Sequence, residues 1–61
     1  MPIVQIELLE GRNLDQRRLL AEKVTNAICE SLDVKPESVR IIMREMKRDS
    51  FARSGKLVCD E

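Results

Sequence analysis

The sequence of 61 residues contains no histidine, tryptophan or tyrosine, and only one phenylalanine. Without histidine there is no Ser–His or Cys–His nucleophilic pair, and the commonest metal ligand is missing. The two cysteines, Cys29 and Cys59, form no CxxC pair, so we expect inert, reduced thiols and no metal site. These absences leave amines, guanidinium groups and carboxylates as the available chemistry.

The sequence also lacks long apolar runs and any excess of charge. No segment has the pattern of a signal peptide or a transmembrane span, so we expect a cytoplasmic protein that does not bind membranes. Eleven basic residues balance eleven acidic ones, which argues against nucleic-acid binding. Between Arg40 and Lys56, however, basic residues exceed acidic ones, and this segment is predicted to receive an anion.

Two segments, residues 2–9 and 38–46, alternate in the manner of β-strands. Between them, residues 14–32 have the spacing of an amphipathic helix. Its apolar positions are Leu20, Val24, Ala27, Ile28 and Leu32. Asn13 and Gln16 have the spacing of a capping box, and the charged residues of the opposite face, Arg17 among them, are expected to lie in solvent.

Strand, helix and strand in this order predict an α/β (α+β) fold with a β-α-β protomer and two parallel strands. After the second strand, Gly55 permits a turn, so a short C-terminal strand or hairpin is expected. We expect one domain over residues 1–61. Two strands covered by one helix leave an edge and a face open, and a chain this short buries little surface. The fold is therefore predicted to be completed by oligomerisation.

Pro2 is the candidate catalytic group. If Met1 is removed, the Pro2 nitrogen becomes a free secondary amine, and an α-amino group has a reference pKa of about 7.7–8.0. Burial among Ile3, Leu9 and Phe51 would lower that pKa toward neutrality, where a general base works best. The alternative is that proline is merely tolerated at the first position of a strand, where its missing N–H needs no partner.

Arg12 and Arg40 are candidate ligands for carboxylates, because a guanidinium group holds a carboxylate with two hydrogen bonds. The structural alternative is that both arginines form surface ion pairs, with Glu10 and Glu45 as partners. Phe51 lies in a polar segment and either lines a pocket or fills a contact between subunits.

Taken together, these motifs resemble the 4-oxalocrotonate tautomerase family. The matching segments are the proline after Met1, LLEGR, DQRRLLAEKVTNAI, VRIIMREM and SF, between Pro2 and about Leu57. The resemblance implies a homo-hexamer built as a trimer of dimers, without a cofactor. It also implies an isomerase that converts 2-hydroxymuconate, or a related 2-hydroxy-dienoate, to its keto form in aromatic hydrocarbon catabolism.

The resemblance gives each candidate residue a role. Pro2 matches the general base, and Arg40 matches the arginine that binds the 2-oxo group and its adjacent carboxylate. Arg12 matches an arginine of a neighbouring subunit that holds the distal carboxylate. Leu9 and Phe51 match apolar residues of the pocket, so the site is predicted to form across subunit contacts.

Two features depart from the family pattern. The chain ends in CDE, where family members have a basic tail, and Arg53 stands where an aliphatic residue is expected. Arg53 either replaces the lost cation or alters the choice of substrate. A related proline-based dehalogenase or decarboxylase, and a non-catalytic subunit of a hetero-oligomer, stay open as alternatives.

Overall fold

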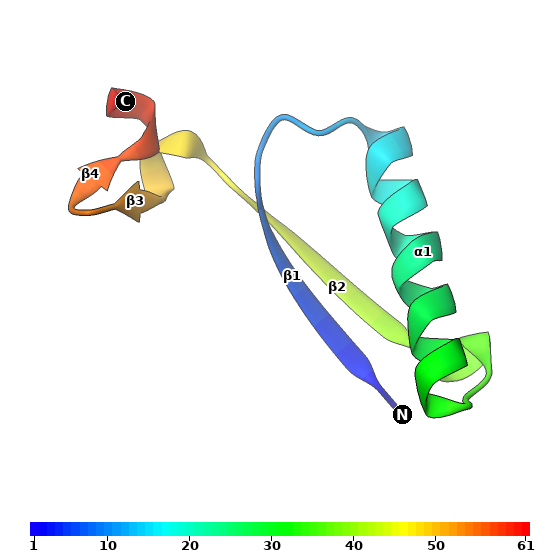
Figure 1. Ribbon diagram of the computed structural model, residues 1–61. Coiled ribbons are helices and arrows are strands. Elements are labelled where there is room, and N and C mark those ends of the chain that lie inside the picture. Colours follow the sequence, from blue (N-terminus) through cyan, green and yellow to red (C-terminus); the bar gives the residue numbers. More distant parts are fainter.

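The computed structural model describes residues 1–61 and consists of a β-α-β unit followed by a small hairpin (Figure 1). The elements are β1 (Ile3–Leu9), α1 (Leu14–Leu32), β2 (Arg40–Met46), β3 (Ala52–Arg53) and β4 (Lys56–Leu57). Short 3₁₀ turns occupy Pro36–Ser38, Arg48–Ser50 and Val58–Asp60. Strands β1 and β2 are parallel, and β3 and β4 are antiparallel, which confirms the predicted fold class.

Helix α1 begins and ends where the sequence predicts. The Asn13 side chain accepts a hydrogen bond from the Gln16 N–H at 2.8 Å, and the Gln16 side chain accepts one from the Asn13 N–H at 3.0 Å. This capping box satisfies two backbone donors that the helix itself cannot use. Asp33, with φ of 55°, ends the helix in the left-handed conformation. None of the helices combines the length and apolar character needed to cross a membrane.

Asn13→Ala is expected to lower the free energy of unfolding by about 1 kcal/mol, because it removes the side-chain acceptor of the cap. In a domain of this size the melting temperature should fall by roughly 4–8 °C. Thermal unfolding followed by circular dichroism at a fixed protein concentration measures the change. Asn26→Ala, at an exposed position inside α1, is the matched control, and an equal loss of stability in both variants would contradict a capping role.

The inner face of the sheet packs against α1 and contains most of the half-buried side chains of both strands. They are Val4, Ile6, Leu8, Ile41 and Met43. The helix contributes half-buried residues that include Leu20, Val24 and Ile28, whereas Ala27 and Leu32, also predicted on the apolar face, are exposed. The alternation predicted for both strands is therefore confirmed, although the strands begin at Ile3 and Arg40 rather than at residues 2 and 38.

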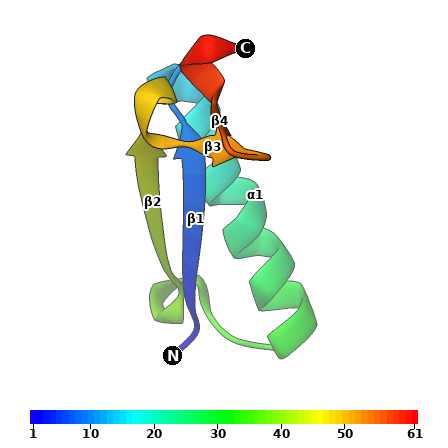
Figure 2. The same cartoon turned by 90° about the vertical axis from the view of Figure 1, so that its left-hand side faces the viewer.

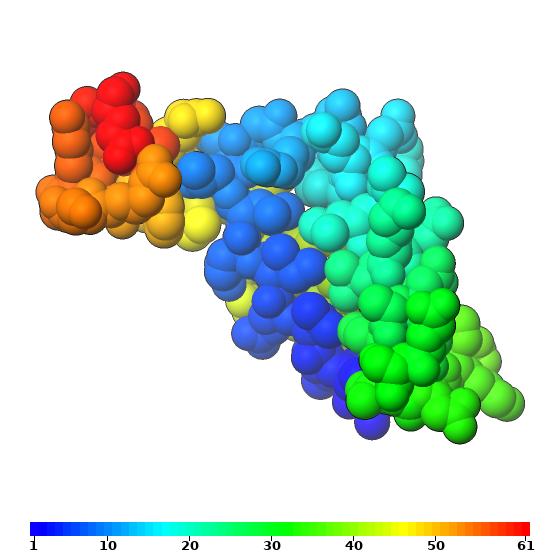
Figure 3. All heavy atoms as spheres, viewed as in Figure 1, coloured from blue at the N-terminus to red at the C-terminus, as the bar shows by residue number.

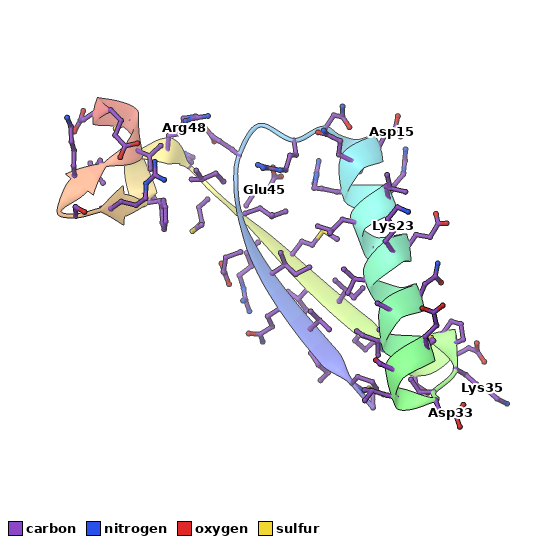
Figure 4. All side chains as sticks on the ribbon, in the orientation of Figure 1. Asp15, Lys23, Asp33, Lys35, Glu45 and Arg48 are labelled. Carbon is purple, nitrogen blue, oxygen red and sulfur yellow. The ribbon has the colours of Figure 1, made fainter.

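The prediction that Arg17 lies on the solvent face of α1 is wrong. Arg17 is half-buried, and its Nη1 lies 3.3 Å from Oε1 of Glu45. Figure 4 shows Glu45 extending from β2 into the space between the sheet and the helix. Residue 17 lies one turn before Leu20, so the helical period places it on the sheet side, where it can pair with the one acidic residue of that face.

The outer face of the sheet has no covering element, as Figure 2 shows, with α1 on one side of β1 and β2 only. The chain has a solvent-accessible surface of 4831 Å², whereas a compact monomer of this mass would expose about 4,000 Å². Its radius of gyration of 14.6 Å likewise exceeds the roughly 10.5 Å of a compact domain of this length. The chain on its own is an open, thin layer, with one buried residue, Val58, and no fully buried side chain.

The C-terminal hairpin projects from the end of the sheet that is remote from the N-terminus (Figures 1 and 3). Its two-residue turn is Ser54–Gly55, with φ of 54° and 78°. Positive φ at both positions is typical of the tight turns that join antiparallel strands. The Val58 N–H donates a hydrogen bond to the Phe51 carbonyl at 2.9 Å, which ties the last turn of the chain to the entrance of the hairpin.

Candidate functional site

Pro2 and Arg40 lie side by side at the N-terminal end of the sheet. The parallel register pairs Ile3 with Arg40, and the Arg40 N–H donates a hydrogen bond to the Pro2 carbonyl at 3.0 Å. Pro2 is half-buried, whereas Met1 is 78% exposed. The fold thus brings together two predicted site residues that are 38 positions apart in the sequence.

The Arg40 guanidinium is anchored on one nitrogen only. Its Nη1 donates to the carbonyl oxygens of Glu37 and Val39, in the turn that leads into β2. Nε and Nη2 have no partner within the chain, and Arg40 forms no ion pair with Glu45, which is bound to Arg17. The free edge of the guanidinium is suited to a planar, bidentate contact with a carboxylate.

Leu9 and Arg12 lie at the other end of the sheet. Leu9 is half-buried and pairs in register with Met46, and Arg12 is exposed in the loop to α1, after Gly11 with its φ of 127°. Arg12 forms no ion pair with Glu10 or any other residue of the chain. Leu9 lies seven positions along the extended strand from Pro2, a distance of roughly 23 Å.

Phe51 and Arg53 belong to the hairpin and also lie far from the Pro2 end. Phe51 is half-buried at the entrance of β3, and Arg53 Nη2 lies 2.7 Å from Oε2 of Glu61. Within one chain, the expected burial of Pro2 among Ile3, Leu9 and Phe51 is therefore not met, because only Ile3 is its neighbour. One chain brings Pro2 and Arg40 together and leaves Arg12, Leu9, Phe51 and Arg53 at the opposite end.

The one hollow on the surface of the single chain is shallow and lies where β2 leads into the hairpin. It encloses about 250 Å³, and its lining residues are Glu10, Lys47, Arg48, Asp49 and Cys59. Figure 4 shows Arg48 at this bend. Lys47 and Arg48 belong to the basic segment that the sequence predicts to receive an anion, whereas nothing in the sequence placed Glu10, Asp49 and Cys59 beside them. Their clustering depends on the turn at Arg48–Ser50, for which the residue pattern gives no signal.

Comparison with known proteins decides the family. A family model described as Tautomerase enzyme matches residues 2–61. The chain belongs to the tautomerase family. A 2-hydroxymuconate tautomerase from Pseudomonas putida is 47% identical over 57 residues, which cover 93% of this chain and 90% of that protein.

Solved structures of other family members have the same fold. A 4-oxalocrotonate tautomerase isozyme from Methylibium petroleiphilum superposes with a TM-score of 0.93 at 37% identity, and the match covers 97% of this chain and 92% of that one. A heterohexamer 4-oxalocrotonate tautomerase from Chloroflexus aurantiacus gives a TM-score of 0.93 at 28% identity, over 98% and 97% of the two chains. As a member of the tautomerase family, the chain is an enzyme of the isomerase class.

Proposed function

We propose that this tautomerase converts 2-hydroxymuconate, or a related 2-hydroxy-dienoate, to its keto form without a cofactor, as a single domain over residues 1–61. The parallel register that sets Pro2 beside Arg40 carries this proposal. The 2-hydroxymuconate tautomerase from Pseudomonas putida, described above, supports the choice of substrate.

Pro2 acts as the base after removal of Met1. In the chain that keeps Met1 the Pro2 nitrogen is part of an amide and cannot accept a proton. Once free, the secondary amine takes the proton from the 2-hydroxyl group, the electron pairs shift along the diene, and the protonated amine returns a proton to carbon. No other atom is gained or lost, so the reaction needs no redox partner.

Arg40 binds the end of the substrate at which charge develops. Its free Nε and Nη2 contact the 2-oxygen and the adjacent carboxylate, while the bonds from Nη1 to the backbone hold the group in place. Donors that are already oriented toward a developing oxyanion stabilise the transition state more than the ground state. Arg40 therefore both binds the substrate and lowers the barrier.

The remaining site residues come from another copy of the chain. Because one chain separates Pro2 from Leu9 by the length of a strand, a neighbouring subunit has to bring its opposite end to Pro2. That end supplies Arg12 for the distal carboxylate, and Leu9 and Phe51 as the apolar wall. We propose a homo-hexamer, built as a trimer of dimers, as the active assembly.

Arg53 is proposed as a further ligand for the substrate, in competition with Glu61. Glu61→Gln should lower KM about two- to fivefold with little change in kcat, because an exposed ion pair of this kind contributes roughly 0.2–1 kcal/mol. Arg53→Ala should raise KM by a similar factor. Steady-state kinetics with 2-hydroxymuconate measures both values. Arg18→Ala is the control, since it removes an equally exposed cation from the helix surface, and unchanged KM in both test variants would remove Arg53 from the site.

Ultraviolet absorbance of 2-hydroxymuconate in the presence of purified enzyme tests the proposed reaction. Rapid conversion to the keto form that depends on Pro2 is expected. Turnover of a 3-haloacrylate with release of halide, without accelerated ketonisation of 2-hydroxymuconate, would show instead that the same proline serves a dehalogenase.

A further inference from the structure

Arg17 and Glu45 form the least exposed of the four ion pairs in the chain, and the only one that joins α1 to the sheet. Their side chains are 33% and 35% exposed, against 67% and 87% for the pair of Arg18 with Asp15 on the surface of α1. The Arg17 Nε is buried and has no partner within the chain. Apolar residues at both positions would pack the two elements without removing charge from water. The pair is therefore better explained by the geometry that it imposes than by stability.

The ion pair anchors one end of the loop of residues 10–13, which joins β1 to α1. At the start of this loop, the Glu10 N–H donates a hydrogen bond to the Met46 carbonyl at 2.8 Å. At its end, Arg17 completes the first turn of α1, and its side chain reaches Glu45 in the space between sheet and helix (Figure 4). Because Glu45 and Met46 are adjacent residues of β2, both ends of the loop are held at one place on the sheet.

Arg12 lies in this loop, directly after Gly11. Gly11 has φ of 127° and the backbone freedom of a residue without Cβ, so the conformation of the loop depends on how its ends are held. The Arg12 side chain is exposed, and the loop decides its direction. A guanidinium group binds a carboxylate with two hydrogen bonds only when its planar fork faces that carboxylate.

We propose that Arg17 and Glu45 are positioning residues, whose ion pair directs Arg12 at the distal carboxylate of the substrate bound at Pro2 of a neighbouring copy. The pair thereby sets a preference for substrates with two carboxylates. This inference rests on the proposed function, which assigns the distal carboxylate to Arg12. Neither Arg17 nor Glu45 contacts the substrate. Without the pair, the loop has to be ordered when the substrate binds, and this ordering weakens binding.

Removal of either partner tests the inference, because position and charge predict different results. Arg17→Met and Glu45→Gln should each raise KM for 2-hydroxymuconate about three- to tenfold, the size of the cost of ordering a long side chain in a loop. If only net charge mattered, loss of the cation would raise KM for this anion and loss of the carboxylate would lower it. The double variant should resemble the single variants, because the same contact is lost in all three.

A substrate with one carboxylate separates positioning from stability. 2-Hydroxypenta-2,4-dienoate lacks the distal carboxylate, so its KM should stay within about twofold of the wild-type value in the same variants. A less stable fold would instead lower kcat for both substrates, because less of the enzyme would be active. Arg17→Lys keeps the charge and should restore most of the affinity for 2-hydroxymuconate. Steady-state kinetics with both substrates measures these values.

Arg18→Met is the matched control, because it removes a guanidinium group from the next position of α1, where the pair does not reach the sheet. It should leave KM for both substrates unchanged. Arg12→Ala separates the inference from the proposed function, and it should raise KM for the diacid more than KM for the monoacid. If it does so while Arg17→Met and Glu45→Gln leave KM unchanged or move it in opposite directions, the inference alone is wrong. If Arg12→Ala affects both substrates alike, the proposed role of Arg12 fails and the inference fails with it.

Discussion

Replacement of Pro2 by alanine is expected to lower kcat for 2-hydroxymuconate about 10²-fold, the lower end of the contribution of a general base. Alanine still presents an α-amino group once Met1 is removed, so part of the basicity survives. The variant loses the pyrrolidine ring, which fixes the backbone dihedral angle and makes the amine secondary. The nitrogen is then less well oriented toward the substrate.

Pro36→Ala is the matched control for this variant, because Pro36 is the only other proline of the chain and begins the turn after α1. It should keep most of the activity. Intact mass must show that Met1 is absent from both proteins before their rates are compared. Equal rates for the wild type and Pro2→Ala would remove Pro2 from the reaction.

Arg40→Ala is expected to lower kcat/KM about 10²- to 10³-fold, as the loss of a donor that stabilises an oxyanion does in other enzymes. Arg40→Lys keeps the charge but loses the planar fork, so it should recover only a small part of the activity. The loss should appear in kcat as well as in KM, because the charge on the substrate oxygen grows in the transition state.

Steady-state kinetics of Arg40→Ala and Arg40→Lys measures both parameters, with circular dichroism to confirm that β2 and α1 still form. Arg18→Ala again serves as the control for the loss of an exposed guanidinium. An increase in KM with unchanged kcat would show that Arg40 binds the substrate but does not lower the activation barrier of the reaction.

The fold was predictable because each local signal agreed with the others. The capping box at Asn13, the helical spacing from Leu14 to Leu32 and the alternation of both strands all appear in the structure. The half-buried position of Arg17 on the sheet side of α1 could also have been predicted from the sequence pattern. Residues 17, 20, 24 and 28 follow one helical stripe, and Glu45 has the same parity along its strand as Ile41 and Met43.

The sequence predicts which residues are candidates for the site, but not how they are arranged in space. Periodicity cannot show that Pro2 and Arg40 share one end of the sheet, which follows from the pairing of Ile3 with Arg40. Nor does it show that Arg53 is bound by Glu61, a contact that depends on the short hairpin. The separation of Pro2 from Arg12 follows from the length of β1, and it is the physical reason for our proposal that a second copy completes the site.

Removal of Met1 tests the central proposal most directly. Protein that keeps Met1, identified by its intact mass, is assayed with 2-hydroxymuconate before and after treatment with methionine aminopeptidase. The rate should rise at least about 10²-fold as the Pro2 amine is released. The same rate before and after complete removal of Met1 would contradict a catalytic role for the Pro2 nitrogen.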